Sequence, residues 1–323
     1  MRILVTGGAG FIGSNIVESL LATTGVEHVR VLDNLATGST ENIAEFYESS
    51  NFEFIQADIR DYSACLHACD EIDLITHQAA LGSVPRSIDD PLTTNEVNIT
   101  GTLNIFEAAK EKKVKRVIYA ASSSTYGDHA GLPKVESEIG RPLSPYAVTK
   151  YVNELYADVF ARVYKMELIG LRYFNVFGPK QNPKGPYAAV IPLFTESLLN
   201  GKAPVINGDG TTSRDFTFVA NAVQANLLSL FTENKQAVNQ VYNIGCGQQT
   251  SLSQLFQYLK KIAGSGIEPI HAPERAGDVK HSLADIAKAK TLLGYDPAVS
   301  VEEGLRQTYE WYKLKTESLE TKA

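Results

Sequence analysis

The first half of the chain alternates short apolar runs with longer amphipathic stretches. The apolar runs are rich in Val, Ile and Leu, and they predict strands over residues 2–7, 28–33, 52–58, 73–79, 115–122 and 167–176. The amphipathic stretches between them predict helices that start near Ile12, Thr40 and Asp61 and that cover residues 94–110 and 146–164. Strands that alternate with helices in this way indicate a parallel sheet with helices on both faces.

The alternation weakens after Asn175. Residues 176–192, "VFGPKQNPKGPYAAVIP", are rich in Pro and Gly and are typical of a loop. Helices are expected over residues 190–200, 219–231, 252–263 and 301–315. The pattern predicts a doubly wound α/β domain over residues 1–173 and a smaller mixed α/β domain over residues 174–323, from which some segments return to the first.

Composition and charge narrow the function classes. The chain has 323 residues, 44% of them apolar, and a net charge of −7, so a nucleic acid is not an expected partner. No apolar run approaches the ~20 residues of a membrane span, and the chain enters its first strand without a secretory signal. Three cysteines are typical of a reducing compartment, which favours the cytoplasm. Two of them lie in "CLHAC", residues 65–69, where the histidine points away from both, so we expect a partly buried helix and no metal site.

A glycine-rich turn lies between the first strand and the first helix. The segment "VTGGAGFIGSN" spaces Gly7, Gly10 and Gly13 as GxxGxxG. Glycines let the backbone turn tightly and approach a pyrophosphate, while the helix N-terminus offers free N–H groups. The alternative is a glycine-rich turn that holds no ligand. In this strand–helix context the motif favours a dinucleotide.

Acidic and polar residues follow the next strands at the same sheet edge. Asp33 ends the second strand, where a carboxylate accepts hydrogen bonds from a ribose diol and repels a 2′-phosphate, which favours NAD over NADP. The alternative is an Asp that caps the next turn. Asp58 after the third strand is placed to meet the adenine edge, and Ile59 to pack on it. Residues 77–84, "HQAALGSV", should pass near the cofactor.

A tyrosine and a lysine lie one helical turn apart in "YAVTK". Tyr146 and Lys150 share a helix face, and a nearby ammonium, like the positive nicotinamide, favours the phenolate. Ser122 begins the hydroxyl run of "AASSSTYG", which ends the fifth strand at the same sheet edge. YxxxK alone is often only an amphipathic surface. With the glycine loop and the Ser-rich strand end before it, it predicts alcohol oxidation with the proton moving to Tyr146.

These features, with "RYFNVFGP", "NGDGTTSRDFTFV", "YNIG" and "RAGDVKHSLAD", resemble the extended short-chain dehydrogenase/reductase superfamily over nearly the whole chain. The resemblance is to its nucleotide-sugar branch, and most of all to the bacterial UDP-N-acetylglucosamine 4-epimerase group. It implies a Rossmann-type fold, an NAD cofactor, a UDP-sugar substrate, and epimerisation at C4 through a 4-keto intermediate. It also implies a homodimer in which two long helices of each subunit form a four-helix bundle.

The resemblance implies a role for each residue that matches a family motif. Tyr146 is implied to be the acid/base, Lys150 its electrostatic helper, and Ser122 the third catalytic residue. The implied cofactor-binding residues are Gly7, Gly10, Phe11, Ile12, Gly13, Asp33, Asn34, Asp58, Ile59, Gln78, Ala79, Ala80, Asn98, Tyr146, Lys150 and Tyr173. The implied substrate-binding residues are Ser83, Ser122, Ser123, Ser124, Asn175, Ala189, Val190, Arg214, Arg275, Asp278 and Ser282. Without the resemblance, Arg214 and Arg275 fit equally well as partners of neighbouring carboxylates.

Four residues help to decide between the possible reactions. The resemblance implies that Ser282 stands at a gate, where a small side chain leaves room for a 2-acetamido group and favours UDP-GlcNAc and UDP-GalNAc, with UDP-Glc and UDP-Gal also possible. Arg86 leaves a uronate substrate open, although a structural role is preferred. The family's dehydratases carry an acidic pair where this chain has Ser123 and Ser124, which disfavours dehydration. A reductase or decarboxylase of the same branch, or a non-catalytic NAD-binding regulator, are the remaining alternatives.

Overall fold

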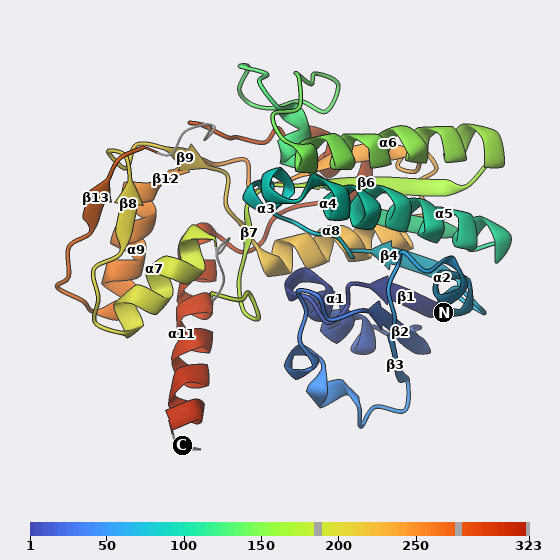
Figure 1. Ribbon diagram of the computed structural model, residues 1–323, viewed down its shortest axis with the longest axis horizontal. Coiled ribbons are helices and arrows are strands. Elements are labelled where there is room, and N and C mark those ends of the chain that lie inside the picture. The colour runs from blue at the N-terminus through green and yellow to red at the C-terminus, as the bar shows by residue number, and fades with distance from the viewer. Residues whose placement is uncertain (184–188, 275–279, 321–323) are drawn as a thin grey trace.

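The computed structural model describes residues 1–183, 189–274 and 280–320. Its centre is a seven-stranded sheet in the order β11-β6-β5-β4-β1-β2-β3, in which every neighbouring pair is parallel (Figure 1). The strands are β1 (Arg2–Thr6), β2 (His28–Asp33), β3 (Phe52–Gln56), β4 (Leu74–His77), β5 (Arg116–Ser122), β6 (Glu167–Tyr173) and β11 (Gln240–Ile244). The expected Rossmann-type parallel sheet is confirmed.

Helices cover both faces of this sheet because its strands are apolar on both sides. In β1, Ile3 and Val5 belong to the core on one face, while Leu4 belongs to the core on the other. The first core also contains buried residues of α1 (Phe11–Leu21) and α8 (Val219–Phe231). The second contains residues of α2 (Tyr62–Ala68), α5 (Gly101–Glu111) and α6 (Pro145–Tyr164).

A smaller part lies beside the carboxyl edge of the sheet (Figure 1). It contains α7 (Val190–Leu199), α9 (Leu252–Ala263) and α11 (Val301–Glu320), with short strands between them. Those strands are β8 (Val205–Asn207) paired with β13 (Ile270–Ala272), and β9 (Ser213–Arg214) paired with β12 (Thr250–Ser251). β7 (Val176–Phe177), which pairs with β10 (Thr217–Phe218), and α10 (Ala287–Leu293) complete the described elements of the second half. In the described chain, no helix has both the length and the apolar character needed to cross a bilayer.

The prediction of a helix that starts near Thr40 is wrong. The chain forms two short 3₁₀ turns there, η1 (Thr40–Asn42) and η2 (Ala44–Phe46). Local polar bonds compete with a longer helix, because Ser39 Oγ accepts from the Glu41 backbone N–H and the Asn42 amide donates to the Ala9 carbonyl oxygen at 2.9 Å. The second of these bonds ties the segment to the glycine-rich turn.

The sequence pattern also missed several elements. β11 adds a seventh strand beside β6, although its motif "YNIG" carries polar residues that obscure a strand pattern. The helix expected over residues 94–110 is three successive pieces: α4 (Pro91–Asn95), a π-helical turn η3 (Glu96–Thr100), and α5. Two further short elements, α3 (Val84–Asp89) and the 3₁₀ turn η4 (Ser123–Tyr126), follow β4 and β5. Both lie where the chain turns over the carboxyl edge of the sheet.

Candidate active site

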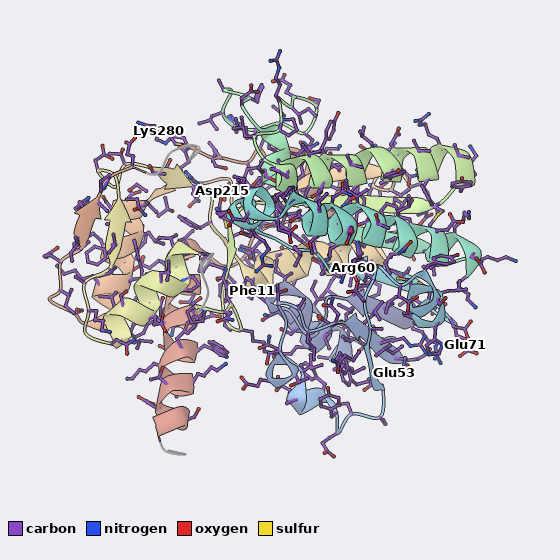
Figure 2. The ribbon with its side chains drawn as sticks, in the orientation of Figure 1. Phe11, Glu53, Arg60, Glu71, Asp215 and Lys280 are labelled. Atoms are coloured by element: carbon purple, nitrogen blue, oxygen red, sulfur yellow. The ribbon has the colours of Figure 1, made fainter. Side chains whose placement is uncertain are left out.

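A cleft of ≈ 750 Å³ runs along the carboxyl ends of the central strands. Its walls come from the residues that follow β1, β2, β3, β4, β5 and β6, so segments distant in sequence meet at one edge. In an open parallel sheet, this edge is where ligands bind. Figure 2 labels Phe11 and Arg60, two residues of its lining, in the part of the molecule that holds the central sheet.

The glycine-rich turn is shaped by the space around it. Gly7 has φ +69°, and a Cβ there would lie 2.6 Å from the backbone nitrogen of Ala79. A Cβ on Gly13 would lie 2.1 Å from the carbonyl oxygen of Gly7. Helix α1 begins after Gly10 with no side-chain cap and no acidic residue in its first turn. Its free N–H groups and positive end therefore suit an anionic pyrophosphate.

Asp33 serves the turn and faces the cleft at the same time. One carboxylate oxygen accepts from the Ala9 N–H at 2.9 Å, and the other accepts from the Leu35 N–H at 2.8 Å. Burial raises the pKa of Asp33, and these backbone bonds oppose that rise. A carboxylate has about four acceptor positions, so both oxygens retain capacity for a ribose diol. Turn capping and ligand binding are therefore compatible here.

A closed ring of hydrogen bonds fixes two residues in the floor of the cleft. The Gln78 amide donates to Asn226 Oδ1 at 3.1 Å, the Asn226 amide donates to the Tyr173 hydroxyl at 2.7 Å, and that hydroxyl donates to Gln78 Oε1 at 3.1 Å. Asn226 comes from α8 and is fully buried. The ring orients the Gln78 amide and the Tyr173 hydroxyl before any ligand arrives.

The hydroxyl of Ser122 and the phenol of Tyr146 meet inside the cleft. Both side chains line the cleft, the Ser122 hydroxyl is near enough to lower the pKa of the phenol, and Tyr146 stands in the first turn of α6 after the Ser144 cap. Ser122 Oγ also accepts from the backbone N–H of Ser124 at 3.1 Å and from its hydroxyl at 2.8 Å. These two donors leave the Ser122 proton to point toward Tyr146 or a substrate oxygen.

Lys150 lies one turn further along α6 and is buried. Its ammonium donates to the Ala120 carbonyl oxygen at 2.9 Å and lies 6.0 Å from the centroid of the Tyr146 ring. Burial lowers the pKa of Lys150 to about 8 and raises the pKa of Tyr146, while the Ser122 hydrogen bond opposes the rise for Tyr146. The expectation that Lys150 and the positive nicotinamide together favour the phenolate stays a prediction.

Most of the sequence-predicted residues line this cleft. The lining includes Gly7, Gly10, Phe11, Ile12, Gly13, Asp33, Asn34, Ile59, Gln78, Ala79, Ala80, Ser83, Ser122, Ser123, Tyr146, Lys150, Tyr173 and Asn175. Asn175 adopts a left-handed φ of +33°, and its carbonyl oxygen accepts from the Thr217 N–H at 3.2 Å. This conformation is unusual for a residue other than glycine, and the hydrogen bond helps to hold it.

Asp58 and Asn98 do not line the cleft themselves but bind residues that do. Arg60 forms an ion pair with Asp58 at 2.8 Å and lowers the pKa of that carboxyl to about 2. Asn98 Oδ1 accepts from the Leu81 N–H at 2.8 Å, and its amide donates to the Leu81 carbonyl oxygen and to Thr149 Oγ1. Asn98 is fully buried, so its placement in the structure is behind the cleft wall formed by Leu81.

The other predicted substrate residues lie outside the lining of this cleft. Arg214 and Ser282 lie on adjoining segments in the smaller part, and Arg214 Nη1 donates to the carbonyl oxygens of Ser213 and Lys280. Ala189 immediately precedes α7, and Val190 begins it. Arg275 and Asp278 fall outside the described residues.

The lining also contains residues that sequence reasoning did not single out. They are Leu32, Ala36, Thr37, Ala57, Arg60, Leu81, Gly82, Thr93, Val97, Ala120, Ala121, Val176, Gln181 and Asn182. Arg60 directly follows the predicted Ile59, and Leu81 and Gly82 lie within "HQAALGSV", so these three belong to segments that the sequence already placed near the cofactor. Among the described residues, no three His, Cys, Asp or Glu side chains gather as a metal site would need.

The comparisons with known proteins agree with this geometry. Residues 3–245 match the NAD dependent epimerase/dehydratase family. The chain is 38% identical over 313 residues to a putative UDP-glucose 4-epimerase of Methanocaldococcus jannaschii, covering 96% of this chain and 98% of that protein.

Two solved structures share the fold closely. A UDP-N-acetylglucosamine 4-epimerase of Methanobrevibacter ruminantium, in complex with UDP-N-acetylmuramic acid, is 40% identical with a TM-score of 0.92, covering 97% of this chain and 98% of that one. A UDP-glucuronic acid 4-epimerase of Bacillus cereus, in complex with UDP-glucuronic acid and NAD, is 35% identical with a TM-score of 0.89, covering 98% and 100%. The chain therefore belongs to the NAD dependent epimerase/dehydratase family, whose cofactor fits the glycine turn and Asp33 of this cleft.

Proposed function

We propose that this protein is a UDP-N-acetylglucosamine 4-epimerase, which interconverts UDP-GlcNAc and UDP-GalNAc through a 4-keto intermediate. The observation that carries the proposal is the meeting of Ser122 and Tyr146, with Lys150 one turn away, in a cleft built for a dinucleotide. A 40% identical neighbour with this activity supports the choice of substrate. The finer assignment rests on Ser282, whose small side chain leaves room for an acetamido group.

NAD⁺ supplies a positive ring that takes up a hydride and gives it back. With Lys150 and the positive ring of bound NAD⁺ favouring its ionised form, the Tyr146 phenolate accepts the proton of the sugar 4-hydroxyl and later returns it to the other epimer. Ser122 donates a hydrogen bond to the reacting oxygen, since Ser124 already fills its acceptor positions. Lys150 holds positive charge beside the phenol and lowers the energy of its ionised form during transfer. The keto sugar has to turn between the two transfers, and the small side chains of Ser122 and Ser123 leave space for that.

The two parts of the chain are proposed to bind different ligands. We assign NAD binding to residues 1–173 and nucleotide-sugar binding mainly to residues 174–323, with β11 and α8 returning to the central sheet. Arg214 and Arg275 are the groups proposed to meet the diphosphate, because a guanidinium forms paired hydrogen bonds with phosphate oxygens. Asn175 and Ser282 complete the proposed substrate side.

A uronate 4-epimerase is the second candidate. Arg86 lines the cleft, where a guanidinium suits a sugar carboxylate. The neighbour from Bacillus cereus, which binds UDP-glucuronic acid, favours the same alternative. The two candidates differ in the group that the hexose carries, so competing substrates separate them.

We also propose that the protein is a homodimer. Helix α6 exposes an apolar stripe of Val148, Leu155, Val159 and Val163, each 41–60% exposed. Side chains spaced four and seven residues apart lie on one helix face and suit a second helix pair. Leu155→Arg should give a monomer in sedimentation experiments, and an unchanged mass would contradict the assignment. The free thiols Cys65, Cys69 and Cys246 support a cytoplasmic location, which cell fractionation tests.

The decisive experiment needs only purified protein. UDP-GlcNAc is incubated without added NAD, and the products are separated as UDP-GlcNAc and UDP-GalNAc, with UDP-GlcNAcA and UDP-Glc as parallel substrates. The proposal expects UDP-GalNAc to form, at a rate at least about tenfold above that for the uronate. Faster turnover of the uronate would select the second candidate, and no turnover of any of the three would overturn both.

A further inference from the structure

The described chain contains a buried carboxylate that the proposed chemistry does not use. Asp215 follows Arg214 of β9, is fully buried, and pairs with no Lys, Arg or His of the described residues. Backbone N–H groups surround it instead. Cys246 N–H donates to one oxygen at 2.7 Å, and Gly247 and Ala284 donate to the other at 3.0 and 3.1 Å. The Gln248 N–H lies close enough to help lower the pKa of the carboxyl.

These donors belong to two segments that are far apart in sequence. Residues 245–248 follow β11 of the central sheet, and Ala284 ends the segment that carries Ser282. Two backbone hydrogen bonds hold the same segment to β9. The Ser282 N–H donates to the Ser213 carbonyl oxygen at 3.1 Å, and the Ser213 N–H donates to the Lys280 carbonyl oxygen at 3.0 Å. Figure 2 places Asp215 between the sheet and the smaller part, with Lys280 beyond it. Asp215 is thus the point where both segments meet the strand of Arg214.

The glycine next to the carboxylate is required by this arrangement. A Cβ on Gly245 would lie 2.8 Å from Asp215 Oδ2 and 2.8 Å from the Ala284 Cβ. Gly247 has φ +68°, which turns the chain so that successive N–H groups face the carboxylate. The sequence "GCG" therefore forms a small anion-binding turn whose anion is a side chain of the same protein.

Only a carboxylate satisfies this turn. It accepts about four hydrogen bonds, whereas an Asn amide offers one oxygen and brings an NH₂ group against an N–H donor. Burial raises the pKa of Asp215 to about 6 against the opposing backbone bonds. A carboxyl with that pKa is mostly ionised at neutral pH, and its charge is compensated by the N–H dipoles rather than by a cation.

We propose that Asp215 is a positioning residue that holds Arg214 and the segment of Ser282 in place on the diphosphate side of the substrate site. This inference rests on the proposed function, because that function assigns nucleotide-sugar binding to Arg214 and Ser282. Asp215 itself touches neither phosphate nor sugar. Asp215 instead fixes the backbone on either side of Arg214, which is the group proposed to meet the diphosphate.

The test is Asp215→Asn, read by UDP binding rather than by turnover alone. Calorimetric titration with UDP should show an affinity at least about tenfold weaker, and the KM for UDP-GlcNAc should rise in parallel. The kcat should stay within about threefold, and the bound NAD content should not change, since the cofactor cleft is built from other segments. Hydrogen exchange should quicken at the amides of Gly247 and Ala284 and stay slow in β1.

Asp285→Asn is the matched control. Asp285 lies on the same segment, but among the described residues its carboxylate accepts only from the Ala287 N–H in its own turn, at 2.8 Å, a bond that Asn also accepts. It should leave UDP affinity unchanged. Gly245→Ala is the second variant, because it crowds the carboxylate without removing it and should reproduce the loss of UDP affinity.

Each outcome decides the inference. Unchanged UDP affinity in Asp215→Asn overturns it. Misfolding of both Asp215→Asn and Gly245→Ala, or joint loss of NAD and UDP, assigns Asp215 to overall stability and also overturns it. A wild-type protein that does not bind UDP contradicts the proposed function itself. A wild-type protein that binds UDP without epimerising UDP-GlcNAc contradicts the proposed substrate, and the UDP titration of the variant still tests Asp215.

Discussion

Two buried charged side chains lie on opposite sides of the site, and the protein makes different numbers of hydrogen bonds to them. Lys150 on the cofactor side makes one hydrogen bond within the described residues, to Ala120, and burial lowers its pKa to about 8. Asp215 on the proposed substrate side accepts from three N–H groups, and burial raises its pKa to about 6. An ammonium has three donors, so Lys150 keeps two for a ligand, whereas three of the about four acceptor positions of Asp215 are filled by the protein. The difference separates a charge with donors left for a ligand from a charge whose partners are mostly backbone groups.

The largest expected effect tests the reacting group beside Lys150. Tyr146→Phe removes the hydroxyl that carries the proton while leaving the ring and the helix in place. Turnover of UDP-GlcNAc should fall by about 10³-fold or more, because general acid–base catalysis is lost. The variant should copurify with as much NAD as the wild type. Turnover within tenfold of the wild type would contradict the role of Tyr146.

The next largest effect tests whether the glycine-rich turn on the cofactor side has room for a side chain at Gly7. Gly7→Ala should abolish retention of NAD, because its Cβ would lie 2.6 Å from the Ala79 backbone nitrogen. Gly25 also has a left-handed φ, +86°, but a Cβ there meets nothing within 4 Å, so Gly25→Ala is the control for backbone strain. NAD content is read from absorbance after denaturation. Equal loss of NAD in both variants would show that strain, and not crowding of the turn, is responsible.

The cofactor side was largely predictable because its determinants are local. Glycine spacing, the Asp that ends β2 and the spacing of Tyr146 and Lys150 each lie within one strand–helix junction, and a parallel sheet brings such junctions to one edge. The fold was predictable for the same reason, except where the hydrogen bonds of Ser39 and Asn42 favour 3₁₀ turns over the expected helix. Local patterns carry little information about which segments meet later in the chain.

The substrate side was less predictable, because its contacts join segments that are distant in the sequence. Asp215 contacts residues 31 to 69 positions away, and no periodicity marks that meeting. β11 was missed because its polar Asn243 is satisfied by Tyr126, whose hydroxyl donates to it at the centre of the molecule, rather than by water. A sequence also does not display the burial of Tyr146, which raises the pKa of its phenol.

A smaller effect concerns selectivity on the substrate side. Ser282→Tyr should lower kcat/KM for UDP-GlcNAc by about 10- to 100-fold while changing that for UDP-Glc by less than about threefold, because the larger side chain fills the space proposed for the acetamido group. Ser282→Thr, a small change in volume, is the control. Equal losses for both sugars would indicate general damage to the segment that Asp215 holds.

The smallest effect concerns the energy of burying Lys150, and its sign follows from the direction of the pKa shift. The pKa falls from 10.5 to about 8 on folding, so between these values the unfolded chain binds more protons than the folded one, and stability rises with pH. Below about pH 8 the full penalty applies. In NAD-free protein, Lys150→Met should therefore be more stable than the wild type near about pH 7, by roughly 1–3 kcal/mol, and this advantage should shrink toward about pH 10. Urea unfolding at both pH values measures the difference, in which the other titrating groups cancel. An advantage that stays constant with pH would mean that Lys150 is not desolvated in the empty cleft, and the contrast with Asp215 would then lie in hydrogen bonding alone.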